Sequence, residues 1–289
     1  MSTLRLGSRE HRDLFCGAFV ATHRTYEPAQ LPWPVLGADA VARLRSLPFW
    51  GEALATERET GAKITAYADT VDDPVLQAAL ALQGREELRH AALLETLTTR
   101  YEIPVVPRRV MPLSENLHQA FVDAGYGECI DSFFAFGLFA LARRSGFFPE
   151  PLLTVVEPIL EEEARHIVFF ANWEAYTQIE GGRGPKALRA GRALRYYVRA
   201  VRRRLGAFKG VKGGSGFTAS GATDVAIDLT PEGFLQTCLR ENARRLATFE
   251  PGLLRPRLVP ALARLTLRGL RLIRSRPHAE GAGPSGRRP

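Results

Sequence analysis

Two hexapeptides in this sequence carry nearly the same reactive side chains, REELRH at 85–90 and EEEARH at 161–166. Both contain the motif Glu-Glu-x-Arg-His, and both lie in strongly helical surroundings. Because an α-helix turns by about 100° per residue, a glutamate and a histidine three positions apart share one face. A carboxylate beside an imidazole, present twice, is a donor set that suits iron or manganese. The two pairs that project together in this way are Glu87 with His90, and Glu163 with His166.

The other charged residues of the two motifs have a different interpretation. Glu86 and Glu162 are more typical of acids that support the ligands, or that lie on the surface, than of ligands themselves. Arg89 and Arg165 then balance the charge of these acids. An exposed, charged helix face would explain one copy of the motif without any metal, but two copies favour a metal site.

A di-metal site between helices needs one further glutamate from each of two other helices. Upstream of Glu87 the candidates are Glu52, Glu57 and Glu59. Glu59 lies with Lys63 on a more polar side of the predicted helix, whereas Glu57 is the single acid in an apolar stripe. We therefore expect Glu57 to be the ligand, with Glu59 as the alternative. The stripe follows steps of three and four residues through Trp50, Leu54, Glu57, Gly61, Ile64 and Ala68.

Upstream of Glu163 the candidate is Glu128, inside the otherwise apolar stretch GYGECIDSFFAFG. A buried carboxylate without a partner is costly, so Glu128 is expected to face a cation or a proton donor. Asp131 follows three positions later on the same face, and we expect it to hold the outer nitrogen of a ligand histidine. The reverse assignment of these two acids stays open. Four other histidines lack acidic partners at helical spacing and are left out of the site, namely His11, His23, His118 and His278.

The candidate ligands repeat in one order along the chain, E…ExxH followed by E…ExxH. Over roughly residues 46–180 this pattern resembles the ferritin-like di-iron carboxylate superfamily. The chain is most similar there to uncharacterised bacterial ferritin-like proteins, and its helix order also resembles small di-iron oxygenases. The resemblance implies an all-α, ferritin-like four-helix bundle with additional C-terminal helices. It also implies two iron ions, with a manganese–iron pair as the alternative.

The function that this resemblance implies is an O₂-dependent di-iron oxidoreductase of the hydroxylase or oxygenase type. Such an enzyme would take electrons from a reductase and act on a small-molecule or carrier-bound substrate. Iron handling or peroxide defence, as in ferritin and rubrerythrin relatives, is one alternative, and a tRNA-modifying hydroxylase is another. A helical binding protein whose site is only structural is the alternative outside enzymes.

Composition is that of an ordinary globular protein, with 45% hydrophobic and 24% charged residues among 289. The three cysteines are far apart and form no C-x-x-C, which argues against a disulfide framework or a cysteine metal site. The first residues contain no apolar core of a secretory signal. The longest apolar stretch, at 132–142, is about half of the ~20 residues that span a bilayer. We therefore expect a cytoplasmic protein.

Breaks in the pattern divide the chain into four predicted parts. These are an irregular N-terminal segment (1–35), the bundle (36–180), a basic helical extension (181–277) and a disordered tail (278–289). The first two bundle helices are predicted to start near Ser46 and at Asp73. A short helix after Ser114 is predicted to lead to the third, which contains GYGECIDSFFAFG. The fourth is predicted to be either kinked or begun at Pro158 and to end at the glycines from 181. No β pattern of useful length is present, and the glycine-rich stretch 210–221 is predicted to be a flexible loop.

The formal net charge of +8 is concentrated in the C-terminal third, with no acid between Gly181 and Thr223. The stretch 186–204 is predicted to form a helix with arginines on one side and apolar residues on another. It either packs on the bundle with a solvated arginine face or binds an acidic substrate, carrier protein or reductase. A nucleic acid or a membrane surface is less favoured there. A second basic amphipathic stretch follows at 255–277, and the sequence leaves homodimerisation open.

Overall fold

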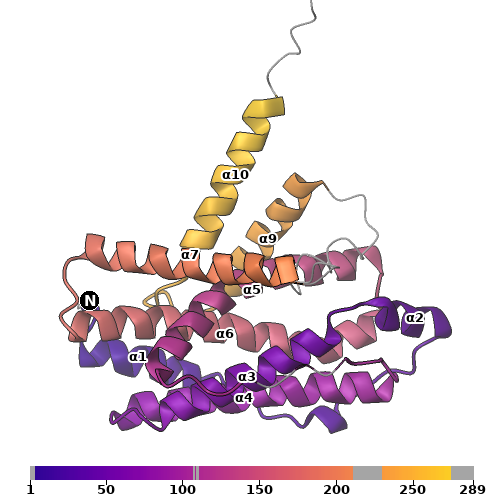
Figure 1. Cartoon of the computed structure of the whole chain (residues 1–289), viewed down its shortest axis with the longest axis horizontal. Helices are drawn as coiled ribbons and strands as arrows, with labels where there is room; N and C mark the ends of the chain where they lie inside the picture. The colour runs from indigo at the N-terminus through magenta and orange to yellow at the C-terminus, as the bar shows by residue number, and fades with distance from the viewer. Residues whose placement is uncertain (1–3, 107, 109–110, 211–229, 275–289) are drawn as a thin grey trace, which may run out of the picture.

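The computed structural model describes residues 4–106, 108, 111–210 and 230–274. Within these ranges every regular element is a helix and no strand is present, which confirms the predicted all-α class (Figure 1). Helix α3 packs along α4, and α5 packs along α6, while α3 also contacts α5. The four long helices of this bundle are α3 (Trp50–Ala68), α4 (Pro74–Arg100), α5 (Leu117–Ser145) and α6 (Glu150–Glu180).

Two of the predicted helix boundaries are confirmed. The carboxylate of Asp73 accepts hydrogen bonds from the backbone N–H groups at the start of α4, and Pro74 occupies its first position. Helix α6 ends at Glu180, directly before Gly181. These ends depend on local backbone chemistry, so the sequence was sufficient to place them.

The predicted helix start near Ser46 is wrong. Ser46 ends a separate helix, α2 (Ala38–Ser46), and α3 begins only at Trp50. The reason is that Leu47 precedes Pro48 and adopts the extended conformation that a residue before proline prefers. Helix α6 starts at Glu150 and contains Pro158, so of the two alternatives for this proline the helix start is wrong.

The N-terminal segment, predicted to be irregular over 1–35, contains helix α1 (Arg9–Ala21). The side chain of Ser8 caps this helix by accepting from the backbone N–H of His11. Phe15 and Phe19 are buried against Phe169 of α6, with ring centroids 5.6 and 4.7 Å apart. A short 3₁₀ helix, η1 (Pro28–Gln30), follows and contacts α4. The segment is therefore part of the packed core.

Within the described residues after α6, three further helices are present: α7 (Lys186–Gly210), α9 (Pro231–Leu246) and α10 (Leu258–Arg274). Helix α7 is held on α5 by ion pairs to Asp123 and Asp131. Most of the glycine-rich stretch and the tail 278–289 lie outside the described residues. None of the described helices combines the length and the apolar content needed to cross a membrane.

Helices α3 and α4 approach closely because glycines face each other across the contact. A Cβ atom on Gly84 would lie 2.5 Å from Thr65 Oγ1 and 3.1 Å from the Thr65 backbone nitrogen. A Cβ atom on Gly61 would lie 3.1 Å from the Gly84 carbonyl oxygen. This contact sets the distance between the helices that carry Glu57 and Glu87.

We predict that Gly84→Ala lowers the free energy of unfolding by about 1–3 kcal/mol, because the added methyl group forces α3 away from α4. Gly17→Ala is the matched control, since no atom lies within 4 Å of the added Cβ in α1. It should be neutral or stabilising by up to about 1 kcal/mol. Urea unfolding followed by circular dichroism measures both, and equal effects would contradict the packing argument.

Candidate metal centre

The six predicted ligands lie together in the middle of the bundle. They form two groups, and within each group the potential ligand atoms all lie within 4.8 Å of one another. Glu87 belongs to both groups. The first group comprises Glu57, Glu87, His90 and Glu163, and the second comprises Glu87, Glu128 and His166.

The structure places Glu57 in this cluster and Glu59 outside it. Glu59 accepts a hydrogen bond of 2.8 Å from Arg108 and is 3.3 Å from Lys63. Although partial burial opposes it, the attraction of these two cations lowers the pKa of Glu59. Glu57 instead lies 3.5 Å from His90 Nδ1. Of the two acids, the one in the apolar stripe is therefore the one that lies in the cluster.

Both histidines of the cluster are oriented by a carboxylate from the opposite motif. His90 Nε2 lies 2.9 Å from Glu162 Oε2, and His166 Nε2 lies 2.9 Å from Glu86 Oε2. Because an ionised carboxylate can only accept, Nε2 carries the proton in both contacts. The Nδ1 atoms are left to face the cluster, which is the arrangement that supporting carboxylates impose on metal-binding histidines.

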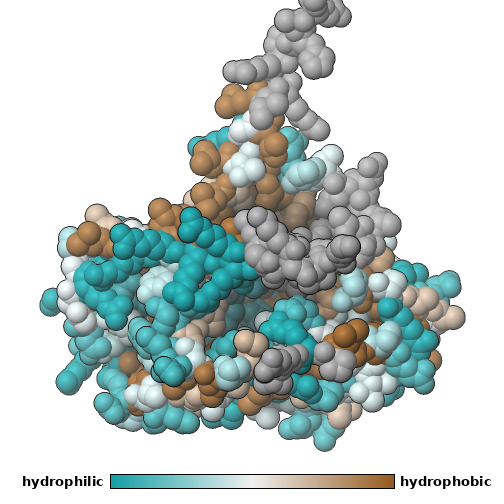
Figure 2. Space-filling model, in the orientation of Figure 1, coloured by the Kyte–Doolittle hydropathy of each residue, from teal (hydrophilic) through white to brown (hydrophobic). Residues whose placement is uncertain are grey.

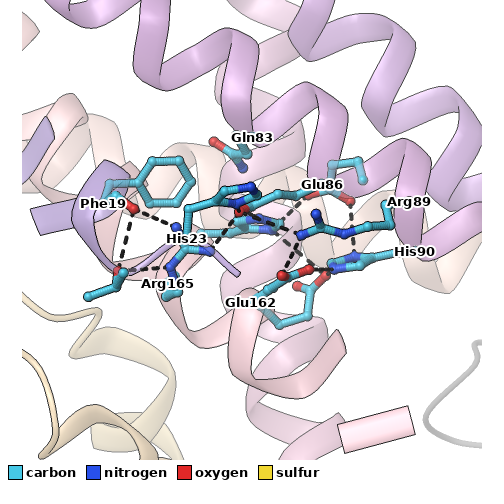
Figure 3. Close-up of polar contacts among 12 residues, drawn as sticks. Phe19, His23, Gln83, Glu86, Arg89, His90, Glu162 and Arg165 are labelled. Carbon is cyan, nitrogen blue, oxygen red and sulfur yellow. Dashed lines mark hydrogen bonds and ion pairs between the residues drawn. The ribbon is translucent and has the colours of Figure 1, made fainter. Parts of the chain in front are cut away.

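The arginines of the motifs complete a reciprocal network (Figure 3). Arg89 donates to Glu162 at 2.5 Å, and Arg165 donates to Glu86 at 2.8 Å. The first glutamate of each motif is thus held by the arginine and the histidine of the other motif. Glu86 and Glu162 are 0% and 1% exposed, so they support the cluster and do not lie on the surface. This exchange explains why the chain carries the pattern twice.

The N-terminal segment supplies a third donor to each of these two glutamates. His23 Nδ1 lies 2.6 Å from Glu86 Oε1, and the Tyr26 hydroxyl donates to Glu162 at 3.2 Å. Arg165 also donates to Thr22 Oγ1 at 3.0 Å. His23 has no acid at helical spacing, so it was not predicted to belong to the site. His23 follows the end of α1, whereas its partner lies 63 positions away in α4, and no signal in a single sequence pairs the two.

Asp131 does not hold a ligand histidine, contrary to the prediction. It forms a two-point ion pair with Arg204 of α7, with Arg204 Nε 2.7 Å from Oδ1, and its side chain is 46% exposed. Three positions along α5 rotate Asp131 away from Glu128 by enough to face α7. Besides Glu128, α5 contributes Ser132, which donates to Glu163 Oε2 at 3.0 Å and which the sequence did not predict.

In the absence of metal, buried acids and both histidines of the cluster retain their protons to higher pH than in water. Burial, with repulsion from Glu87 and Glu163, raises the pKa of Glu57 to about 8 and that of Glu128 well above its ordinary value. Burial alone would lower the pKa of His90, but its hydrogen bond to Glu162 and the nearby carboxylates of Glu57 and Glu163 raise it well above the usual range. The same balance, with Glu87 as the main charge, raises the pKa of His166.

Several inward-facing atoms of the cluster lack hydrogen-bond partners. They are Nδ1 of His90, Nδ1 of His166, Oε1 of Glu87 and Oε1 of Glu128. His166 Nδ1 lies 2.8 Å from Glu87 Oε1 without the geometry of a hydrogen bond. Buried polar atoms normally have partners, and cations between these atoms would supply them. Four ionised carboxylates carry a charge of −4, which two divalent ions neutralise, so the donor set fits two metal ions.

Comparison with protein families, curated proteins and solved structures found no match to this chain.

We predict that the metal-free protein loses stability as the pH rises from about 6 to about 9. The raised pKa values of Glu57, Glu128, His90 and His166 mean that the folded state binds more protons than the unfolded state, so the slope of unfolding free energy against pH is negative. The lowered pKa of Glu163 acts only below about 4.5, outside this window.

Urea unfolding at a series of pH values measures this slope. Excess Mn²⁺ should abolish or reverse it, because metal binds the deprotonated ligands. Stability of the metal-free protein that increases over the same range would show that the cluster does not retain protons.

Proposed function

We propose that this protein is an O₂-dependent di-iron oxidoreductase of the ferritin-like carboxylate type. The observation that carries the proposal is the pair of carboxylate–histidine groups that share Glu87. Both histidines present an unpartnered Nδ1 to the cluster, and both are held from behind by a buried glutamate. Oxygen and imidazole donors without a thiolate suit iron or manganese.

The side chains divide naturally between two ions. Glu57 and His90 would hold one, and Glu128 and His166 the other. Glu163 Oε1 lies 3.5 Å from His90 Nδ1 and 3.9 Å from His166 Nδ1, so it faces both sites, as Glu87 does. A bound iron pair would supply the redox chemistry with O₂ that side chains lack.

The protein's own contribution is to seal one side of the cluster and leave the other accessible. On the histidine side, His90, His166 and Glu86 are completely buried beneath the N-terminal segment. On the other side, the side chains of Glu57 and Glu163 are 20% and 15% exposed. We therefore infer that substrate approaches from the side on which Glu57 of α3 and Glu163 of α6 are partly exposed, while water is excluded behind the histidines.

The reciprocal network also fixes the form of the ligands. Glu86 and Glu162 accept the Nε2 protons, which keeps each Nδ1 lone pair available for metal. Arg165 and Arg89 neutralise these glutamates, so that the supporting acids add little negative charge to the four carboxylates inside. The cluster can then change its charge with the metals and protons that it binds.

We predict that the protein binds two Fe²⁺ or Mn²⁺ ions per chain and that Glu57→Ala removes one or both. Glu59→Ala is the matched control, because Glu59 is an acid of the same helix that pairs with Arg108 and Lys63 instead. Elemental analysis after anaerobic reconstitution measures the loss. Equal retention of metal by the two variants would refute the assignment of Glu57, and background metal in the wild type would refute the site.

We predict that the anaerobically loaded protein reacts with O₂ and, with a reductant present, does so repeatedly without releasing iron. Oxygen consumption and optical spectra follow the reaction. Uptake and mineralisation of Fe²⁺ far beyond two per chain would instead indicate iron handling. Preferential consumption of H₂O₂ over O₂ would indicate peroxide defence, and RNA that remains bound through purification would favour a tRNA-modifying enzyme.

A further inference from the structure

Helix α10 is attached to the body along one side only. It packs on α9 and α5, where Ala263 and Leu267 are buried. Ala263 belongs to a small apolar cluster with Phe133 and Cys238. Beyond these contacts the helix projects away from the bundle (Figure 1). Its orientation is therefore set by the contacts with α5 and α9, and its opposite side is turned outward.

The outward side of α10 is a row of exposed leucines. Leu262, Leu265 and Leu272 are 50%, 64% and 71% exposed, and their spacing of three and seven residues places them on one face. Figure 2 shows the apolar side chains continuing along α10 where it leaves the body. Large aliphatic side chains gathered on one exposed face indicate an interaction site.

Arginines border this leucine row. Arg264 and Arg268 are exposed, and Arg268 follows Leu265 by three positions and precedes Leu272 by four. Neither α10 nor α7 contains an aspartate or a glutamate. On α7, the apolar residues Leu194 and Val198 are exposed together with arginines instead of packing on the bundle. The two cationic, amphipathic helices lie on the same side of the molecule (Figure 1).

The charge and shape of the exposed face of α10 favour one kind of binding partner over the others. A second copy of α10 would bring arginine rows together without any acid on either helix, which is unfavourable. A nucleic acid would leave the leucines exposed. A protein partner is typically gripped by aromatic anchors or a groove, whereas α10 is a single convex helix whose residues include no aromatic side chain. A fluid bilayer needs neither groove nor anchor, and its anionic head groups attract arginine.

We propose that α10 lies on the surface of membranes that contain anionic lipids, with its leucine row among the acyl chains and its arginines at the head groups. Helices with a strong separation of leucine and arginine faces bind in this way, and binding strengthens with the apolar area buried and with the negative charge of the lipid. The contacts of Ala263 and Leu267 would hold α10 in position to dock the whole protein.

Sedimentation with vesicles tests the proposal on the full-length protein. The wild type should bind vesicles that contain phosphatidylglycerol, bind phosphatidylcholine vesicles weakly, and be released by salt. Leu265→Gln with Leu272→Gln should weaken binding about tenfold or more, because two buried leucines are lost. Arg264→Gln with Arg268→Gln should weaken it and reduce its dependence on salt.

Matched pairs elsewhere on the surface control for hydrophobicity and charge. Val20→Gln with Leu113→Gln removes two apolar side chains that are 48% and 50% exposed. Arg240→Gln with Arg244→Gln removes two exposed arginines, four positions apart, from α9. Both pairs should bind vesicles as the wild type does. Absence of wild-type binding, or equal loss in the control pairs, would overturn the proposal.

A second measurement keeps the test independent of folding defects. The emission of a tryptophan placed by Leu272→Trp should shift to shorter wavelength with phosphatidylglycerol vesicles, because the ring enters the acyl region. An unchanged spectrum would contradict the docking of α10. A change from dimer to monomer in the leucine variant, with vesicle binding retained, would show that the face binds a second copy instead.

Discussion

The buried glutamates Glu86 and Glu162 are the constraint on which the centre of this structure depends. Each lies in the core without solvent, and each is satisfied by three donors from other parts of the chain. Removing one partner of a buried ion pair typically costs about 3–5 kcal/mol, because a charge is left uncompensated. The network therefore joins α4 to α6 in one register, and that register is the one in which His90 and His166 face each other with ring centroids 5.5 Å apart.

The arrangement of the six candidate ligands follows from this network around Glu86 and Glu162. Since the Nε2 atoms are occupied by Glu86 and Glu162, the Nδ1 atoms face the interior together with acids from all four bundle helices. Burial, together with the repulsion between these carboxylates, raises the pKa of Glu57 to about 8. The bundle accommodates this repulsion because the surrounding core is extensive and because protons, or metal ions, neutralise the site.

The helices outside the bundle, α1, α7 and α10, have different roles. Helix α1 and the residues after it cover the histidine side of the cluster and add His23 and Tyr26 to the network. Helix α7 is anchored by Asp131, an acid that is turned outward from α5. Helix α10 contributes little to the bundle and directs its leucines away from it. The candidate metal centre and the proposed membrane surface are thus carried by separate elements, which allows each to vary without disturbing the other.

The sequence by itself determined the features that depend on local spacing. Helical periodicity predicted the all-α class, the i, i+3 relation paired Glu87 with His90, and the apolar stripe distinguished Glu57 from Glu59. Asp73 and Pro74 marked the start of α4 because capping involves only neighbouring residues. Tertiary structure decided the features that depend on contacts between distant segments. The partner of His23 lies 63 positions away in the sequence. Asp131 forms an ion pair with Arg204 because of the way in which α7 packs on α5. The pairing of each motif's first glutamate with the histidine and arginine of the other motif could not be predicted either. A repeated sequence pattern does not show which residues of the two copies are in contact, because that depends on how α4 packs against α6.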